Sequence, residues 1–226
     1  MLTAVREAVL DAWAVLQPVE CAGCGEPDRG ICDRCRTQLR ARVRPREIPG
    51  LDVPVFAATD YDGVVRSLLL AGKEEGRTDA LRTLAPLLAT AIGSAVADLD
   101  PTAGPVELSW IPSTRAAIRR RGFDPVLVMI RAARLPCSRV LTVSGMVQQK
   151  RLGRDARADA AVGRMRSRGR LDGRRFLLVD DVVTTGATIS AAVAAIRLGG
   201  GRVCAVCCLG TVTLRYPTRD TGAAGH

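Results

Sequence analysis

The chain has 226 residues, of which 47% are hydrophobic and 3% aromatic, and its formal net charge is +10. This content supports a sizeable core in one ordinary domain with a small additional module. No apolar run approaches the ~20 residues of a membrane span, and Arg6, Glu7 and Asp11 interrupt the segment that a signal peptide would keep uncharged. We therefore expect a cytoplasmic protein without membrane insertion.

The first segment predicts a helix over residues 1–17, because Val5, Val9, Trp13 and Leu16 recur at helical spacing. Its polar face is not basic, so we expect it to pack within the protein and not on a membrane.

Residues 18–40 contain two Cys-x-x-Cys pairs, Cys21 with Cys24 and Cys32 with Cys35. This spacing is typical of a closed, four-thiolate zinc site with a structural role. Redox-active pairs or a site for another metal are the alternative, although a cytosolic compartment disfavours disulfides.

Residues 41–52 are rich in Pro, Arg and Gly and predict a linker. The following pattern predicts a strand at 53–59, a short helix at 61–70, a long helix at 78–99 and a strand at 106–111. That strand leads into the turn Pro112-Ser113-Thr114-Arg115. The planar guanidinium group of Arg115, with its paired N–H donors, suits the binding of an anion in addition to the phosphate considered below. An ordinary turn before a basic helix face is the alternative.

A helix at 124–134 and a strand at 139–143 come next, followed by the Gly- and Arg-rich segment 144–170. Its length indicates either an active-site lid or disorder. Between residues 115 and 175 there are seventeen basic residues against four aspartates, a local charge of +13. Such an excess suggests a polyanionic partner, nucleic acid or pyrophosphate, and a solvated basic face is the alternative.

The most informative stretch is 175–188, in which an apolar run from Phe176 to Val179 predicts a buried parallel strand. Asp180 and Asp181 follow, and then Thr184, Thr185, Gly186, Ala187 and Thr188 form a small-residue loop before an apolar helix at 189–198. Such a loop offers backbone N–H groups and hydroxyls to a phosphate. Two acids beside it suit the hydroxyls of a phosphorylated sugar. A capped strand–loop–helix with surface acids is the alternative.

The last strand, at 202–209, contains Cys204, Cys207 and Cys208. We interpret these cysteines as buried thiols, because positions three apart on a regular strand point to opposite faces. Residues 216–226 predict a disordered tail, which contains the chain's one histidine, His226.

The stretch from Phe176 to Thr188 resembles the phosphoribosyl pyrophosphate signature of type I phosphoribosyltransferases. The resemblance implies that Asp180 and Asp181 contact the ribose hydroxyls and that residues 184–188 bind the 5′-phosphate. Purine-salvage members of the group have an acid where this chain has Thr184, which cannot act as a general base at neutral pH.

The zinc pairs and the signature together resemble the ComF family, named for competence for DNA uptake. The resemblance extends from Pro18 to Gly210. It also rests on weaker matches at Tyr61-Asp62-Gly63, Gly72-Lys73, Ile111-Pro112 with Arg115, Arg121-Gly122-Phe123, and Gln149 with Leu152 and Arg157. Family members usually have Asn and Gln where this chain has Asp124 and Pro125.

This resemblance implies an α/β fold of the type I phosphoribosyltransferase class over residues 53–215, mostly a parallel sheet flanked by helices, after a zinc ribbon. It implies that the chain binds phosphoribosyl pyrophosphate together with Mg²⁺, and that Arg115 and Lys73 are further contacts to this ligand. It also implies a phosphoribosyltransferase, with an acceptor that is not identified, that acts in DNA uptake or nucleotide metabolism. The alternative is a non-catalytic protein that handles single-stranded DNA with competence-machinery partners and senses a ligand in the sugar-phosphate pocket. A zinc-dependent scaffold with a vestigial pocket is a third reading.

Overall fold

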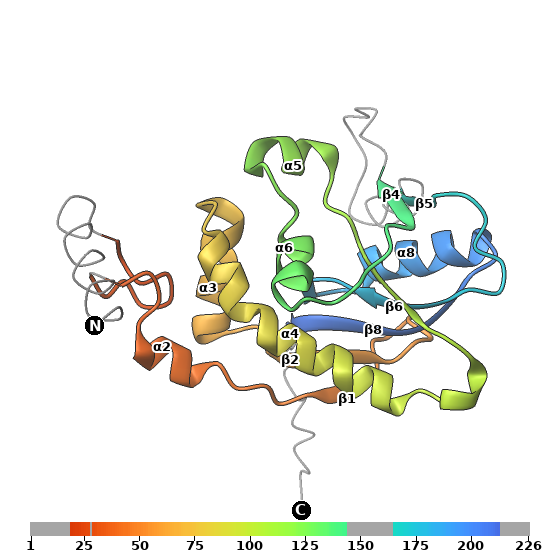
Figure 1. Cartoon of the computed structure of the whole chain (residues 1–226), viewed down its shortest axis with the longest axis horizontal. Helices are drawn as coiled ribbons and strands as arrows, with labels where there is room; N and C mark the ends of the chain where they lie inside the picture. The colour runs from red at the N-terminus through yellow and green to blue at the C-terminus, as the bar shows by residue number, and fades with distance from the viewer. Residues whose placement is uncertain (1–18, 28, 144–164, 213–226) are drawn as a thin grey trace, which may run out of the picture.

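The computed structural model describes residues 19–27, 29–143 and 165–212 (Figure 1). The predicted N-terminal helix at 1–17, residues 144–164 of the predicted lid and the predicted tail at 216–226 lie outside the described residues.

The centre of the molecule is a mixed, mostly parallel sheet with helices on both faces (Figure 1). Four parallel strands lie in the order β2 (Val55–Asp60), β8 (Arg202–Thr211), β6 (Arg175–Val179) and β3 (Glu107–Trp110). Strand β1 (Arg44–Arg46) pairs antiparallel with β2, and the short β7 (Val182–Val183) extends the pairing along β8. The predicted α/β class is confirmed at this level.

One face of the sheet is covered by α3 (Gly63–Glu74), α4 (Thr78–Asp98) and α6 (Pro125–Ala132). The opposite face is covered by α8 (Ala187–Leu198) and by a small antiparallel pair, β4 (Leu141–Val143) with β5 (Met165–Ser167). Because both faces are buried, the central strands are almost wholly apolar, as a buried parallel sheet requires.

Three short elements complete the description. Helix α2 (Asp33–Gln38) belongs to the cysteine segment, η1 (Pro101–Ala103) is a single 3-10 turn after α4, and α5 (Arg115–Arg121) stands away from the sheet. Gly122, in the left-handed conformation with φ 82°, ends α5 and turns the chain into α6.

Helix α4 has 21 residues and a mean hydropathy of 1.4, so by length and composition it could cross a membrane. In the fold, half of that apolar stretch is buried, and α4 packs against β2, β8, α3 and α6. These contacts are those of a core helix.

The structure departs from the sequence-based expectations at three places. The predicted strand at 139–143 does form, but it pairs with β5 outside the central sheet. The predicted linker at 41–52 contains β1, and Ile48 and Leu51 from this segment pack on the core. One extra residue in β8 shifts its register against β6, so Cys204 and Cys207 both contact the core on the α4 side of the sheet. The prediction that these two cysteines face opposite ways is therefore wrong. Cys207 and Cys208 are buried as expected, whereas Cys204 is only half-buried.

Candidate functional site

Polar residues gather at the edge of the sheet where the parallel strands end. Strands β3 and β6 end at Trp110 and Val179, which are register partners, so the segments that follow them emerge side by side. Between these segments, α6, α8 and the β4–β5 pair lies a hollow of about 360 Å³. Its polar lining consists of Ser113, Thr114, Asp180, Asp181 and Thr188. Open α/β sheets bind ligands at this edge.

The paired acids are held closely by the backbone. The N–H of Asp180 donates to the carbonyl of Cys207 on β8, and the N–H of Asp181 donates to Oδ1 of Asp180 at 2.8 Å. Burial, and then the neighbouring carboxylate of Asp181, raise the pKa of Asp180 well above its usual range. A carboxyl group with a raised pKa at the end of a buried strand is costly for stability, which indicates a role other than packing.

The predicted phosphate loop, residues 184–188, spans the start of α8: Gly186 is the N-cap, and Ala187 and Thr188 already belong to the helix, which begins two residues earlier than predicted. Gly186 is left-handed, with φ 78°, and a Cβ there would lie 3.0 Å from Cγ2 of Ile48. The side chain of Thr185 accepts from the N–H of Ala187 at 3.5 Å. Thr184, Thr185 and Thr188 are all exposed, and of the five loop residues only Thr188 lines the hollow.

The turn after β3 is fixed to α6 by Asp124. Its Oδ2 accepts from the N–H of Ser113 at 2.8 Å, and its Oδ1 accepts from Val126 and Leu127 at the start of α6. Asp124 is only 7% exposed. Asp124 thus caps the start of α6 and holds the turn after β3 in place.

Arg115, a predicted ligand contact, lies at the first position of α5 with an exposed side chain. It follows Thr114, whose hydroxyl caps α5 by accepting from Ala117 at 3.2 Å. Thr114 lines the hollow and Arg115 does not.

Lys73, the other predicted contact, extends from the last turn of α3 to the acids. Its Nζ lies 2.7 Å from Oδ2 of Asp181, and the two side chains are 22% and 17% exposed. The structure therefore brings Lys73 together with the acid pair.

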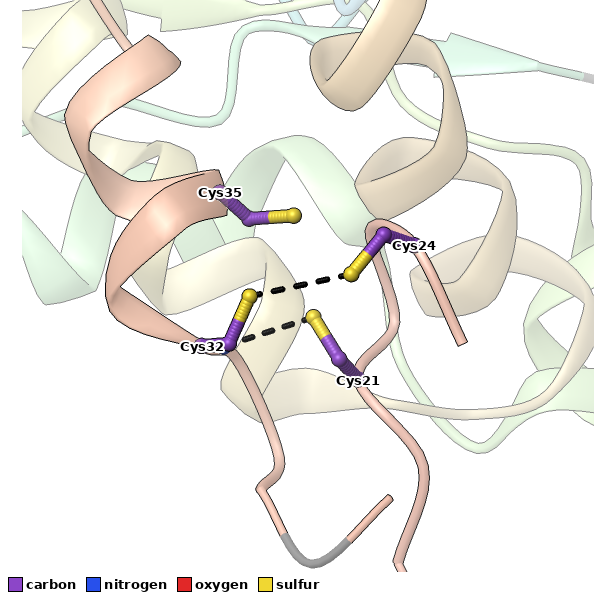
Figure 2. Close-up of side chains that lie close together, drawn as sticks. All are labelled: Cys21, Cys24, Cys32 and Cys35. Carbon is purple, nitrogen blue, oxygen red and sulfur yellow. Dashed lines mark hydrogen bonds between the residues drawn. The ribbon is translucent and has the colours of Figure 1, made fainter. Parts of the chain in front are cut away.

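The four cysteines of the N-terminal segment form a second site (Figure 2). Their sulfur atoms point toward one another and all lie within 4.8 Å of each other. Tetrahedral coordination with Zn–S bonds of about 2.3 Å places sulfurs ~3.8 Å apart, and Sγ of Cys24 lies 3.7 Å from Sγ of Cys32. All four cysteines are free thiols. The cluster could therefore hold zinc with four protein ligands.

Hydrogen-bond donors lower the pKa of Cys21 and Cys24 and so favour their thiolates, whereas burial raises the pKa of Cys35. Burial raises the pKa of Cys21, but hydrogen bonds from the backbone of Cys32, Gly23 and Cys24 outweigh it and lower the pKa to about 6. A guanidinium nitrogen of Arg34 lies 3.5 Å from Sγ of Cys24. Such donors around the sulfurs are typical of structural metal sites.

The cysteine segment is fixed to the main body by an arginine that the sequence analysis did not identify. The guanidinium of Arg77, between α3 and α4, donates to the carbonyls of Glu20 at 3.0 Å and Gly30 at 2.8 Å. Asp79 holds the same guanidinium at 2.9 Å. Its contacts join segments too distant in sequence for a local pattern to reveal.

Comparison with models of known protein families finds no match, and no curated protein has a significantly similar sequence.

Proposed function

We propose that the hollow binds a phosphorylated pentose, with phosphoribosyl pyrophosphate as the preferred ligand. One observation carries this proposal: Asp180, Asp181 and Thr188, from opposite ends of the signature, line one hollow together with the Ser113-Thr114 turn. The acids accept the ribose hydroxyls, and the loop at the N-terminus of α8 binds the 5′-phosphate.

We further propose that the fold is of the type I phosphoribosyltransferase class and that the chain is a ComF-family protein. Two features support this assignment. The first is the order along the chain: the cysteine cluster, then Lys73, the turn at 112–115 and the signature at 176–188. The second is that Lys73, the turn and the signature converge at one edge of the sheet.

The reaction that suits this site is transfer of the phosphoribosyl group. A nitrogen nucleophile attacks ribose C1 as the bond from C1 to the pyrophosphate oxygen breaks, and pyrophosphate leaves. Asp180 and Asp181 orient the ribose and favour positive charge that develops on the ring. Mg²⁺, when bound, would neutralise the pyrophosphate oxygens.

Calorimetric titration with phosphoribosyl pyrophosphate in Mg²⁺ tests the binding. We expect the double variant Asp180→Asn with Asp181→Asn to lose at least tenfold in affinity. Asp98→Asn, an exposed acid at the end of α4, is the matched control and should bind as the wild type does. Equal affinity of the double variant and the wild type would refute the ribose assignment.

The transfer step is tested by pyrophosphate release from phosphoribosyl pyrophosphate with a pool of nucleobases. Release that depends on one base would identify both the reaction class and the acceptor. Binding without release by any base would favour a sensor or a nucleic-acid-handling protein that uses the same pocket.

The basic helix α5 favours that second function, non-catalytic handling of single-stranded DNA. Arg115, Arg119 and Arg120 are exposed on α5, which stands away from the sheet (Figure 1) and directly follows Thr114 of the hollow. Phosphate contacts release counterions, so DNA affinity should fall steeply with salt. Affinity that does not change between 50 and 200 mM salt, or no binding at low salt, would exclude this function.

A further inference from the structure

Lys73 and Asp181 form an ion pair at the hollow. Lys73 follows Gly72, which is pressed against α4 so closely that a Cβ at this glycine would lie 2.5 Å from Cδ2 of Leu81. Leu81 is fully buried. The last turn of α3 therefore has a fixed position, and the long Lys73 side chain extends from it to the hollow.

The charges around the acid pair are unbalanced without this lysine. Asp180 is affected by the carboxylates of Asp181 and Asp124, while Lys73 is the cation acting on it. Within the described ranges, no other Lys or Arg lies within 4.0 Å of a carboxylate oxygen of Asp180 or Asp181. Both members of the pair are mostly buried, so water screens their attraction much less than at the surface.

A divalent cation would compete for the same oxygen. Magnesium ions bind proteins through one or two carboxylate oxygens with near-ideal octahedral geometry. The ammonium group already lies 2.7 Å from Oδ2 of Asp181. A metal ion at that oxygen would have to displace Lys73 or accept a positive charge next to it.

We propose that Lys73 is a built-in counter-ion that keeps divalent cations off Asp181, so that the acid pair takes sugar hydroxyls without a metal ion bound to it. The assignment of sugar hydroxyls rests on the proposed function, whereas the exclusion of cations from Asp181 does not. In this arrangement a metal ion enters the site only on the phosphate groups of a ligand. Lys73 is then a specificity-determining residue for the acid pair, and it does not have to contact pyrophosphate.

The first experiment measures Mn²⁺ binding to the full, zinc-loaded chain by electron paramagnetic resonance, with no sugar phosphate present. We expect the wild type and Lys73→Arg, which keeps the charge, to bind Mn²⁺ weakly. Lys73→Gln should gain one site with at least tenfold tighter binding, and the added Asp181→Asn substitution should remove it. Equal Mn²⁺ affinity of Lys73→Gln and the wild type would overturn the proposal. Lys73→Ala gives the same test if Lys73→Gln does not fold.

The second experiment uses ribose 5-phosphate, which has the hydroxyls and one phosphate but no pyrophosphate to bring its own metal ion. With the zinc-loaded chain, the wild type should bind it equally, within twofold, in buffer without added divalent cations and in Mg²⁺, while Lys73→Gln should bind at least fivefold more tightly in Mg²⁺. Equal metal dependence of the two proteins would overturn the role of Lys73. Absence of ribose 5-phosphate binding in both would instead refute the proposed function, and the Mn²⁺ result would still decide whether Lys73 excludes cations.

Discussion

At the scale of single residues, Asp180 combines a stability cost with a position in the proposed site. Its carboxyl group lies between a buried strand and a second carboxylate, and both neighbours oppose its ionisation. Residues held in such unfavourable environments are often retained for function, and replacing them commonly stabilises the protein.

We expect Asp180→Asn to stabilise the fold at neutral pH while it weakens sugar-phosphate binding. The pKa of Asp180 is raised above its ordinary value of 3.8, so the folded state holds its proton more tightly than the unfolded state does. Stability is therefore lost as the pH rises through the interval between the unfolded and folded pKa values. Asparagine removes this loss and can still accept the N–H of Asp181. A gain of about 1 kcal/mol is typical of such substitutions, and it would raise the melting temperature by roughly 2–4 °C.

Thermal melts of Asp180→Asn and the wild type at several pH values check this expectation. The difference should be largest near pH 8 and should vanish toward pH 4. A variant that is less stable than the wild type at pH 8 would contradict the argument.

A second residue-scale prediction concerns Glu107, which binds Arg174 through two contacts of 2.7 Å and also accepts from Ser138. The hydrogen bonds from Arg174 are the main cause of a lowered pKa of Glu107. The stability that the Glu107–Arg174 ion pair contributes is therefore present above the pKa of Glu107 in the unfolded chain. It is lost as the pH falls through the pKa of Glu107 in the folded protein, which lies below about 4.5. Because both side chains are more than a third exposed, Glu107→Gln should cost no more than about 1 kcal/mol at pH 7.

Urea unfolding at pH 7 and pH 3 measures this contribution. The Glu107→Gln and wild-type curves should converge at pH 3. The matched control is Asp172→Asn, from the highly exposed pair with Arg170, and it should unfold as the wild type does at both pH values.

At the scale of elements, the contact between α3 and α4 depends on a glycine that gives no signal in the sequence. Gly72→Ala would place a methyl group 2.5 Å from Cδ2 of Leu81, which is fully buried. Overpacking of this kind typically costs about 1–3 kcal/mol. Because Lys73 follows Gly72, the same substitution should also shift the ammonium group away from Asp181.

Gly93→Ala in α4 is the matched control, since a Cβ there meets no atom within 4 Å. It should stabilise the helix by about 0.5–1 kcal/mol, because alanine favours helix formation. Chemical denaturation of both variants measures the contrast. Equal effects of the two substitutions would show that α3 and α4 adjust to each other without cost.

The elements that the sequence predicted best are those with local signals. The run from Phe176 to Val179 is bounded by charged residues on both sides, and α8 follows a glycine with the required left-handed backbone. Elements whose formation depends on distant pairing were missed or misplaced. Strand β4 forms only because β5 pairs with it, and a single extra residue in β8 turns Cys204 toward the α4 side of the sheet.

In the candidate site, too, residues with a local sequence signal could be predicted and contacts between distant segments could not. The acids and Thr188 could be placed near a ligand from the signature alone, because they follow one strand and begin one helix. That Lys73 pairs with Asp181, and that Asp124 holds Ser113, depends on packing between segments far apart in the chain.

At the scale of the whole molecule, the cysteine segment and the α/β body share one core. Cys21, Cys32 and Cys35 belong to the same buried cluster as Leu68 and Leu81. Together with the carbonyl contacts of Arg77, this continuity indicates that the cysteine cluster and the sheet unfold as one unit.

With zinc bound to the four cysteines, its removal should therefore lower the stability of the entire protein. Metal bound at a thousandfold excess over its dissociation constant contributes about 4 kcal/mol, which corresponds to a fall of roughly 10 °C in melting temperature on chelation. Calorimetry should show one transition that moves to lower temperature, and Cys35→Ser should behave in the same way. A separate low-temperature transition with the main one unchanged would show that the cluster folds independently.

Strand β1 also affects how the molecule behaves in a crowded solution. Its sequence, Arg44-Pro45-Arg46, covers the outer edge of β2, whose residues Val55, Phe56, Ala57 and Ala58 are buried. A proline cannot donate a further ladder hydrogen bond, and two like charges repel a second copy of the same strand. Strand β1, in a segment that resembles a linker, thus protects the protein from aggregation. Loss of β1 would leave the apolar edge of β2 free to pair with other chains.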